Sequence, residues 1–317
     1  MRVLPARLND KPQYVFHPAR AFRRAMHGRS WSPGSNRGLE IALLPWGLPL
    51  EVHAGEAIGL SIVTGGVFDP CVSEAMHRLV DPGDLVADVG ANQGYLTSLA
   101  AARTGSSGCV LAFEPHPRVY SVLARNVERW TDFSGVAPVE ARQIALSDTD
   151  GIGTLSSGSE FEANMGLAAL KPDAVPDGKG LLPVTMSRLD DIIGDRIVGL
   201  IKIDVEGHET EVLRGAVELL HSGRVRDVIF EDHHDYPDDA TKLVEGAGLH
   251  LFSLANDLFG LEIGVPADRG ETPAWPGPSY LATRDPQRAL DRLRPRGWRI
   301  AGIGPSFTRG PSRRRSG

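Results

Sequence analysis

Hydrophobic residues follow two spacings along most of this chain, and each spacing predicts a different element. Short apolar runs, often closed by an acidic residue, are typical of buried strands, whereas apolar positions three and four residues apart are typical of amphipathic helices. In the clearest helix, Val119, Val122 and Leu123 share one face. Strands are predicted at 85–88, 110–114, 141–146, 200–204, 225–232, 249–253 and 279–283, and helices at 95–103, 117–130, 208–221 and 239–247.

This alternation predicts an α/β fold, in which helices cover both faces of a mostly parallel sheet. Residues 147–198 interrupt the alternation and are rich in Gly, Ser, Pro and Asp. We interpret them as an insertion that contains one short strand. It ends at a helix over 189–193, which begins at a pair resembling a capping box, Ser187 and Asp190.

The chain ahead of this core predicts an extension that packs on it. Two short apolar runs flank a turn, and Asp69 followed by Pro70 is typical of a helix start. The predicted regions are a loosely ordered basic lead-in at 1–38, a hairpin and helix at 39–80, the main domain at 81–285 with its insertion at 147–198, and a partly disordered tail at 286–317.

The composition is that of an ordinary globular protein, with 41% hydrophobic and 23% charged residues among 317. The net charge of −6 argues against nucleic acid as the main partner, because phosphate binding requires a basic surface. Two cysteines, Cys71 and Cys109, build no disulfide framework and fit a reducing cytoplasm. The sequence contains neither an apolar run of membrane-spanning length nor the pattern of a secretory signal.

The strongest local signal is the segment DVGANQGY at 88–95, which follows a predicted strand and opens a helix. Gly90 and Gly94 let the backbone turn tightly and approach a ligand closely. The spacing argues against a dinucleotide, because Asn92 stands where the pyrophosphate-binding pattern needs its second glycine. Asp88 would repel a pyrophosphate, whereas it can anchor an ammonium group directly or through water. The segment therefore favours a ligand with a cationic amino-acid moiety.

Two further strand ends supply candidates for nucleoside binding. Glu114 ends the next strand, where a carboxylate can accept both hydroxyl protons of a ribose. Ser147 and Asp148 follow the third strand and are candidates for contacting an adenine amino group, with a plain turn as the alternative.

The segment IKIDVEGHE at 201–209 places Lys202 and Asp204 on one face of a central strand. A buried lysine is costly unless it is paired, so we expect Lys202 to have a carboxylate or carbonyl partner or to line a cleft. Asp204 ends the strand and is expected to face the ligand. His208 starts the following helix and is a candidate general base, with a capping or packing role as the alternative.

Acids and histidines also cluster in the segment FEDHHD at 230–235. Asp204, Glu231 and Asp232 carry the oxygen ligands that a hard divalent cation such as Mg²⁺ prefers. The alternative is a set of solvated loop charges in an acidic protein, so the metal ligands stay unassigned.

Together these segments resemble the FkbM-type methyltransferases. The resemblance covers roughly residues 60–235 and depends on DVGANQGY, FEPHP, IALSD, LDDII and above all IKIDVEGHETEVLRGA. It implies the class I methyltransferase fold, a Rossmann-like seven-stranded sheet whose last strand is antiparallel, and S-adenosylmethionine as cofactor. The residues that match the family's cofactor loop and ribose acid are Asp88, Gly90, Asn92, Gly94 and Glu114.

The resemblance also implies methylation of a hydroxyl on a small molecule or glycan: a sugar, a glycolipid or a natural-product scaffold. A hydroxyl is a poor nucleophile until a base or a metal helps it to lose its proton. His208 is the first candidate base, with Asp204 orienting it or binding a cation and Glu231 as a further catalytic candidate. The alternatives are a non-catalytic methyltransferase-like binding subunit and a nicotinamide-dependent oxidoreductase, against which the glycine spacing argues.

Overall fold

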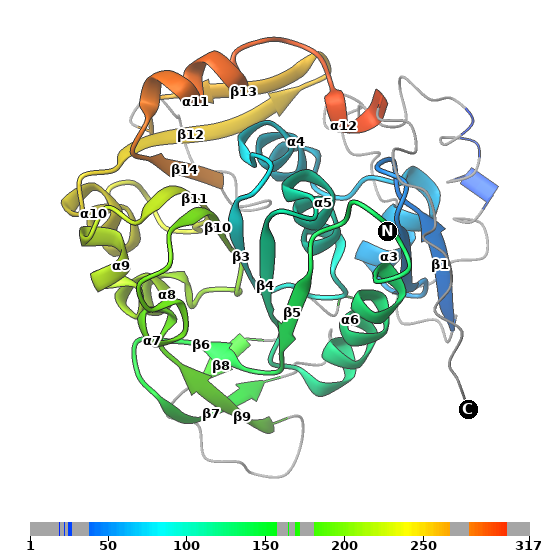
Figure 1. Cartoon of the computed structure of the whole chain (residues 1–317), viewed down its shortest axis with the longest axis horizontal. Helices are drawn as coiled ribbons and strands as arrows, with labels where there is room; N and C mark the ends of the chain where they lie inside the picture. The colour runs from blue at the N-terminus through cyan, green and yellow to red at the C-terminus, as the bar shows by residue number, and fades with distance from the viewer. Residues whose placement is uncertain are drawn as a thin grey trace, which may run out of the picture.

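An eight-stranded sheet forms the centre of the computed structural model. The structure describes residues 19, 22, 25, 26, 38–156, 164, 169–171, 181–266 and 279–302. The strand order is β13-β12-β14-β11-β10-β3-β4-β5 (Figure 1). The bounds of these strands are β3 (Leu85–Val89), β4 (Cys109–Phe113), β5 (Val139–Arg142), β10 (Val198–Ile203), β11 (Val225–Glu231), β12 (His250–Asp257), β13 (Gly260–Gly264) and β14 (Ser279–Thr283).

The strand directions confirm the predicted α/β fold. The strands β5, β4, β3, β10 and β11 are parallel neighbours. The strand β14 enters antiparallel between β11 and β12, as the resemblance implied for the last strand. The sheet has one strand more than the seven expected, because the chain turns after β12 and adds β13 antiparallel at the edge.

Helices cover both faces of the sheet, and alternate residues of a strand enter different cores. Val86 and Leu200 pack with residues of α4 and α5, whereas Ala87 and Ile201 pack with residues of α8, α9 and α10 on the other face. No helix in the described ranges combines the length and the apolar composition needed to cross a membrane. The bounds of these helices are α4 (Pro70–Leu79), α5 (Tyr95–Thr104), α8 (Glu209–Arg214), α9 (Val217–His221) and α10 (Asp239–Gly246).

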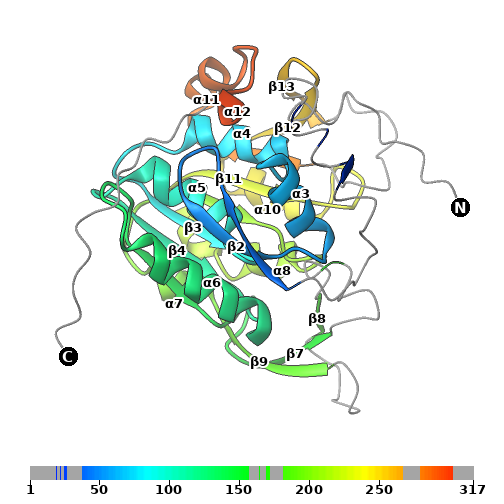
Figure 2. The same cartoon turned by 90° about the vertical axis from the view of Figure 1, so that its right-hand side faces the viewer.

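The N-terminal extension forms the predicted hairpin, in which β1 (Leu39–Leu43) and β2 (Pro49–His53) pair antiparallel. The hairpin lies beside α6 (Pro117–Trp130), as Figure 2 shows. The helix α3 (Ala57–Gly65) was not predicted. The residues of α3 are apolar on most sides of the helix. It therefore lacks the single apolar face by which an amphipathic helix is recognised in a sequence.

The insertion departs most from the prediction. The run at 141–146 is not one strand, because β5 ends at Arg142 and β6 (Ala145–Leu146) joins a separate sheet of order β6-β9-β7-β8. This sheet lies at the bottom of Figure 1. The insertion supplies three of its strands instead of one: β7 (Gly151–Ser156), β8 (Ala169–Lys171) and β9 (Leu181–Ser187).

The helix α7 (Leu189–Ile193) forms as predicted, but its predicted capping box is wrong. Ser187 belongs to β9, and α7 has no side-chain cap. Asp190 accepts hydrogen bonds instead from the backbone N–H groups of Glu218 and Leu219, at distances of 3.1 and 2.8 Å. It therefore satisfies the free donors at the start of α9, a helix distant in sequence.

The predicted helix at 208–221 is divided into α8 and α9. Gly215 lies at the break, where a Cβ atom would stand only 2.0 Å from the carbonyl oxygen of Ser147. The end of β6 thus packs directly on the backbone between the two helices, and this contact requires glycine.

Beyond the predicted domain boundary at 285, the described chain is helical. The helices α11 (Pro286–Leu293) and α12 (Arg299–Gly302) contact α4 at the upper side of Figure 1.

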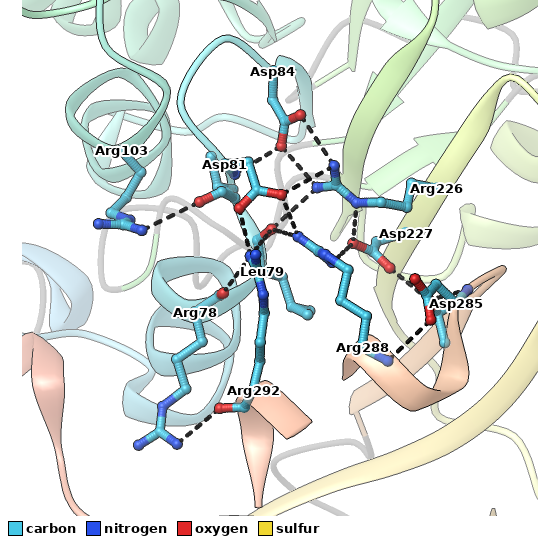
Figure 3. Close-up of polar contacts among 12 residues, drawn as sticks. Arg78, Leu79, Asp81, Asp84, Arg103, Arg226, Asp227, Asp285, Arg288 and Arg292 are labelled. Carbon is cyan, nitrogen blue, oxygen red and sulfur yellow. Dashed lines mark hydrogen bonds and ion pairs between the residues drawn. The ribbon is translucent and has the colours of Figure 1, made fainter. Parts of the chain in front are cut away.

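Figure 3 shows the charged network beneath them, at the amino ends of the strands. Arg226 binds Asp84 and Asp227, at 2.7 and 2.9 Å, and Arg288 binds Asp227 and Asp81, at 3.1 and 2.7 Å. The charges at this edge neutralise one another.

Candidate active site

The loop between β3 and α5 owes its path to two glycines with positive φ. At Gly90 (φ 74°), a Cβ atom would stand 1.9 Å from the carbonyl oxygen of Asp204. At Gly94 (φ 96°), it would stand 2.8 Å from a methyl carbon of Leu123. The first glycine brings the loop against the end of β10, and the second brings it against α6. Both residues therefore allow close packing within the protein.

Glu114, at the end of β4, is bound to this loop. Its Oε2 accepts a hydrogen bond from the backbone N–H of Asn92 at 3.0 Å, and its Oε1 accepts one from the backbone N–H of His116 at 2.8 Å. The side chain is buried, and burial raises the pKa of Glu114 to about 7 despite these two bonds. The structure thus brings the first two sequence motifs together.

Lys202 is paired, as predicted. Its ammonium lies 3.4 Å from Asp88 Oδ1 and 3.6 Å from Asp204 Oδ2, and it donates a hydrogen bond to the carbonyl oxygen of Gly90 at 2.9 Å. Burial opposes its charge, but Asp204 and Asp88 outweigh this effect and raise the pKa of Lys202. The lysine is therefore a cation that joins β3, β10 and the loop.

Asp88 is fully buried beneath the loop. Its Oδ2 accepts a hydrogen bond from the Thr97 hydroxyl at 2.5 Å, while its Oδ1 faces Lys202. The charge of Asp88 thus already has a partner within the protein. In this arrangement Asp88 supports the loop from below, and its anchoring of a ligand ammonium group, directly or through water, stays a prediction.

Three non-glycine residues in the described part of the chain have positive φ: Asp69 (40°), Asn92 (50°) and Glu206 (52°). Such conformations are unfavourable by about 1–3 kcal/mol each and concentrate at functional sites. Asn92 lies in the loop above Lys202, and both acids interact electrostatically with Lys202 and Asp204. The strained backbone is therefore gathered around the carboxyl ends of β3 and β10.

Glu206 and Asp69 were not among the predicted site residues, although both titrate near neutral pH. Burial, with Asp204 and Glu209, raises the pKa of Glu206 to about 7. Burial raises the pKa of Asp69 to about 6, against the hydrogen bond from the backbone of Val72. In the sequence, an Asp before a Pro indicates only a helix start, and Glu206 is distinguished only by its place in the IKIDVEGHE segment.

His208 and Ser147, predicted for different roles, contact each other. The Nε2 atom of His208 lies 3.0 Å from the Ser147 hydroxyl, which also donates to Asp148 at 3.2 Å. The Nδ1 atom lies 3.5 Å from Glu211. The expected orientation of His208 by Asp204 is therefore wrong, because the ring nitrogens face Ser147 and Glu211 and Asp204 faces Lys202. Burial lowers the pKa of His208, so its ring is neutral at neutral pH.

The three acids predicted as metal ligands do not form one group. Asp204 interacts with Lys202, and Glu231 lies 3.7 Å from the ring of His233. Asp232 turns instead into its own loop and accepts a hydrogen bond from the backbone N–H of His234 at 2.9 Å. Among the described residues, the three-residue group with metal-ligand spacing is Asp232, His234 and Asp238.

Comparisons with known proteins agree with this geometry. The family model described as "Methyltransferase FkbM domain" matches residues 88–254. The chain is 33% identical over 212 residues to 31-O-demethyl-FK506 methyltransferase FkbM of Streptomyces tacrolimicus, a match that covers 57% of this chain and 79% of that protein. It is 29% identical over 178 residues to hexuronic acid methyltransferase AglP of Haloferax volcanii, covering 52% of this chain and 63% of that protein.

The crystal structure of methyltransferase FkbM from Methylobacillus flagellatus has a TM-score of 0.40 and 15% identity, over 66% of this chain and 50% of that one. At that TM-score the likeness adds nothing to the topology described above. The sheet order, the glycine loop after β3 and the acid after β4 are those of class I S-adenosylmethionine-dependent methyltransferases. Because the family model matches more than half of its length, this chain belongs to the FkbM methyltransferase family. It is therefore an enzyme that uses S-adenosylmethionine, and the oxidoreductase alternative is excluded.

Proposed function

We propose that this enzyme methylates a hydroxyl of a sugar, a glycolipid or a natural-product scaffold. The names of two relatives support this acceptor class, since one is named for a 31-O-demethyl compound and the other for a hexuronic acid. The observation that supports methyl transfer is the contact between Glu114 and the backbone of Asn92, which joins the proposed ribose-binding acid to the proposed cofactor loop.

The residues at the ends of β3 and β4 fit the cofactor. Each Glu114 oxygen accepts one backbone hydrogen bond and retains a lone pair for a ribose hydroxyl. We assign the adenine contact to Ser147 or Asp148 and the remaining contacts to the loop at 90–94. The bound cofactor supplies a methyl group on a cationic sulfonium, and the acids around Lys202 make the site favourable for a cation.

Two residues of the β10–α8 loop are suited to act as the base that removes the proton from the hydroxyl of the methyl acceptor. His208 is the first proposed base, because its buried ring is neutral at neutral pH. Its Nε2 is already in contact with Ser147, so the acceptor must displace that hydroxyl or act through it. Glu206 is the second proposed base, since its pKa of about 7 lets it both accept and release a proton and it is only half-buried.

Asp204 and Glu231 complete the proposed catalytic set. The side chain of Asp204 is 40% exposed, and its charge is one cause of the raised pKa of Glu206. Glu231 lies at the carboxyl end of the neighbouring strand, on the side proposed for the acceptor. A Mg²⁺ ion shared by Asp204, Glu231 and Asp232 would require these side chains to turn toward one another, so the proposed proton transfer uses the side chains alone.

The proposal is tested by methyl transfer from deuterated S-adenosylmethionine to a panel containing a hexuronic acid, a glycolipid and a hydroxylated polyketide. Mass spectrometry should find the label on an oxygen of one acceptor class. Glu114→Ala should lose both cofactor affinity and turnover, whereas the exposed Glu262→Ala should behave as the wild type. Label found on nitrogen, sulfur or carbon, or on none of these acceptors, would overturn the proposed acceptor class.

A further inference from the structure

The loop between β11 and α10 gathers three metal-ligating side chains outside the site described above. Asp232, His234 and Asp238 each offer one ligand atom within 4.8 Å of the others. Asp232 directly follows β11, and Asp238 is the N-cap residue of α10. The short loop therefore brings together the end of a central strand and the start of a helix.

The buried carboxylate of Asp232 has an oxygen without a partner. Its side chain is only 4% exposed. The Oδ1 atom accepts a hydrogen bond from the backbone N–H of His234 at 2.9 Å and lies 2.8 Å from the Nδ1 atom of the same residue. The Oδ2 atom is buried and has no hydrogen-bond partner among the residues that the structure describes. A carboxylate oxygen in this state is unfavourable unless a proton or a cation binds it.

Asp238 supplies a second acid next to this oxygen. Its carboxylate already caps α10, accepting from the backbone of Ala240 and from the backbone and hydroxyl of Thr241. A ligand atom of Asp238 lies within 4.8 Å of a ligand atom of Asp232. Two facing carboxylates repel each other unless a positive charge lies between them.

We propose that Asp232, His234 and Asp238 bind one divalent cation of the Mn²⁺, Co²⁺ or Zn²⁺ type. Two carboxylates and one imidazole form a donor set that suits these ions better than Ca²⁺, which takes oxygen ligands alone. The His234 side chain is 71% exposed, so the open side of the site can keep water ligands. The cation neutralises the acid pair and fastens the end of β11 to the start of α10.

This site differs from the acid set Asp204, Glu231 and Asp232, and a binding experiment separates the two. Full-length protein is dialysed against EDTA and titrated with Mn²⁺, with free Mn²⁺ measured by electron paramagnetic resonance. One ion per chain should bind. His234→Ala and Asp238→Asn should weaken binding about tenfold or more. Asp239→Asn, the same charge change one residue further on, is the matched control and should bind as the wild type.

His234→Ala is the decisive variant, because removing an exposed ring should leave the fold intact. Unchanged Mn²⁺ affinity in His234→Ala and Asp238→Asn would overturn the proposal, as would the absence of Mn²⁺ binding to the wild type. A loss of affinity in Asp204→Asn or Glu231→Gln but not in His234→Ala would overturn it by placing the ion at the other acid set. Affinity for S-adenosylhomocysteine, measured in the same samples, reports on the methyltransferase site separately.

Discussion

Lys202 and Asp88 occupy the same register position on the adjacent parallel strands β10 and β3, with Lys202 Nζ 3.4 Å from Asp88 Oδ1. Both side chains are almost wholly buried. Their charges lie at the point where the loop of the cofactor site leaves β3, and Lys202 also binds the carbonyl oxygen of Gly90 in that loop. The cofactor loop is thus anchored by an ion pair under it, which the bound ligand does not need to contact.

Lys202→Met should lower the free energy of unfolding by about 3–5 kcal/mol, because it leaves the buried Asp88 carboxylate without a cation. Methionine keeps most of the volume of the stem, so a cavity is not the cause. Urea denaturation followed by circular dichroism measures the change. The exposed Lys242→Met is the control and should be neutral. Wild-type stability in Lys202→Met, together with lost acceptor affinity, would show instead that the lysine serves the acceptor.

The affinity for S-adenosylhomocysteine should depend on pH through Glu114. In the proposed cofactor site the ribose hydroxyls would donate to the ionised carboxylate, and the pKa of Glu114 in the free protein is about 7. Affinity should therefore be constant above pH 7 and should fall by up to about tenfold per pH unit below it. Calorimetry across this range measures the effect.

Glu114→Gln is the control for this assignment. It should bind more weakly than the wild type at high pH, by about 1.5–3 kcal/mol for the lost charge-assisted hydrogen bonds, and should show no such pH dependence. A parallel decline of affinity with falling pH in wild type and Glu114→Gln would assign the titration to another group.

The two proposed bases predict different pH–rate profiles. If Glu206 takes the proton, kcat should rise with pH, with a midpoint at about pH 7. The kcat of Glu206→Gln should then be lower than that of the wild type by a factor of about 10²–10⁴. If His208 does so, the midpoint should lie below the usual range of histidine, because burial lowers the pKa of His208. His208→Ala should then be the variant that loses the rate. Equal, near-normal rates in both variants would exclude both residues as the base.

The charged network at the amino ends of the strands should support stability without affecting the cofactor. Asp227 is fully buried and binds Arg226, Arg288 and the hydroxyl of Thr283 (Figure 3). Asp227→Asn should lower the free energy of unfolding by about 1.5–3 kcal/mol, since Arg226 and Arg288 lose one charged hydrogen-bond acceptor while Asp84 and Asp81 still pair with them. The affinity for S-adenosylhomocysteine should not change, because the proposed cofactor site lies at the opposite edge of the sheet. The exposed Asp291→Asn should alter neither quantity.

The sequence by itself was sufficient for features with a local cause. The helix at 117–130 and the strand at 279–283 have the predicted bounds, because apolar spacing and the flanking turns are encoded within each segment. The contact between the loop after β3 and Glu114 could also be expected, since residues that end parallel strands meet at one edge of the sheet. The pairing of Lys202 followed from the cost of burying an isolated charge.

Only the tertiary structure decided which distant side chains meet. The register of β10 and β3 places Lys202 beside Asp88. The side chain of Asp204 pairs with the same lysine and not with His208. The path of the insertion brought Ser147 to His208, and the loop after β11 turned Asp232 toward Asp238. The contact of Asp232 with Asp238 is made within one loop, whereas the others depend on chain segments far apart in sequence and on the burial they create together. For this reason the sequence was sufficient to identify candidate site residues, whereas their interaction partners and their pKa shifts could be found only from the tertiary structure.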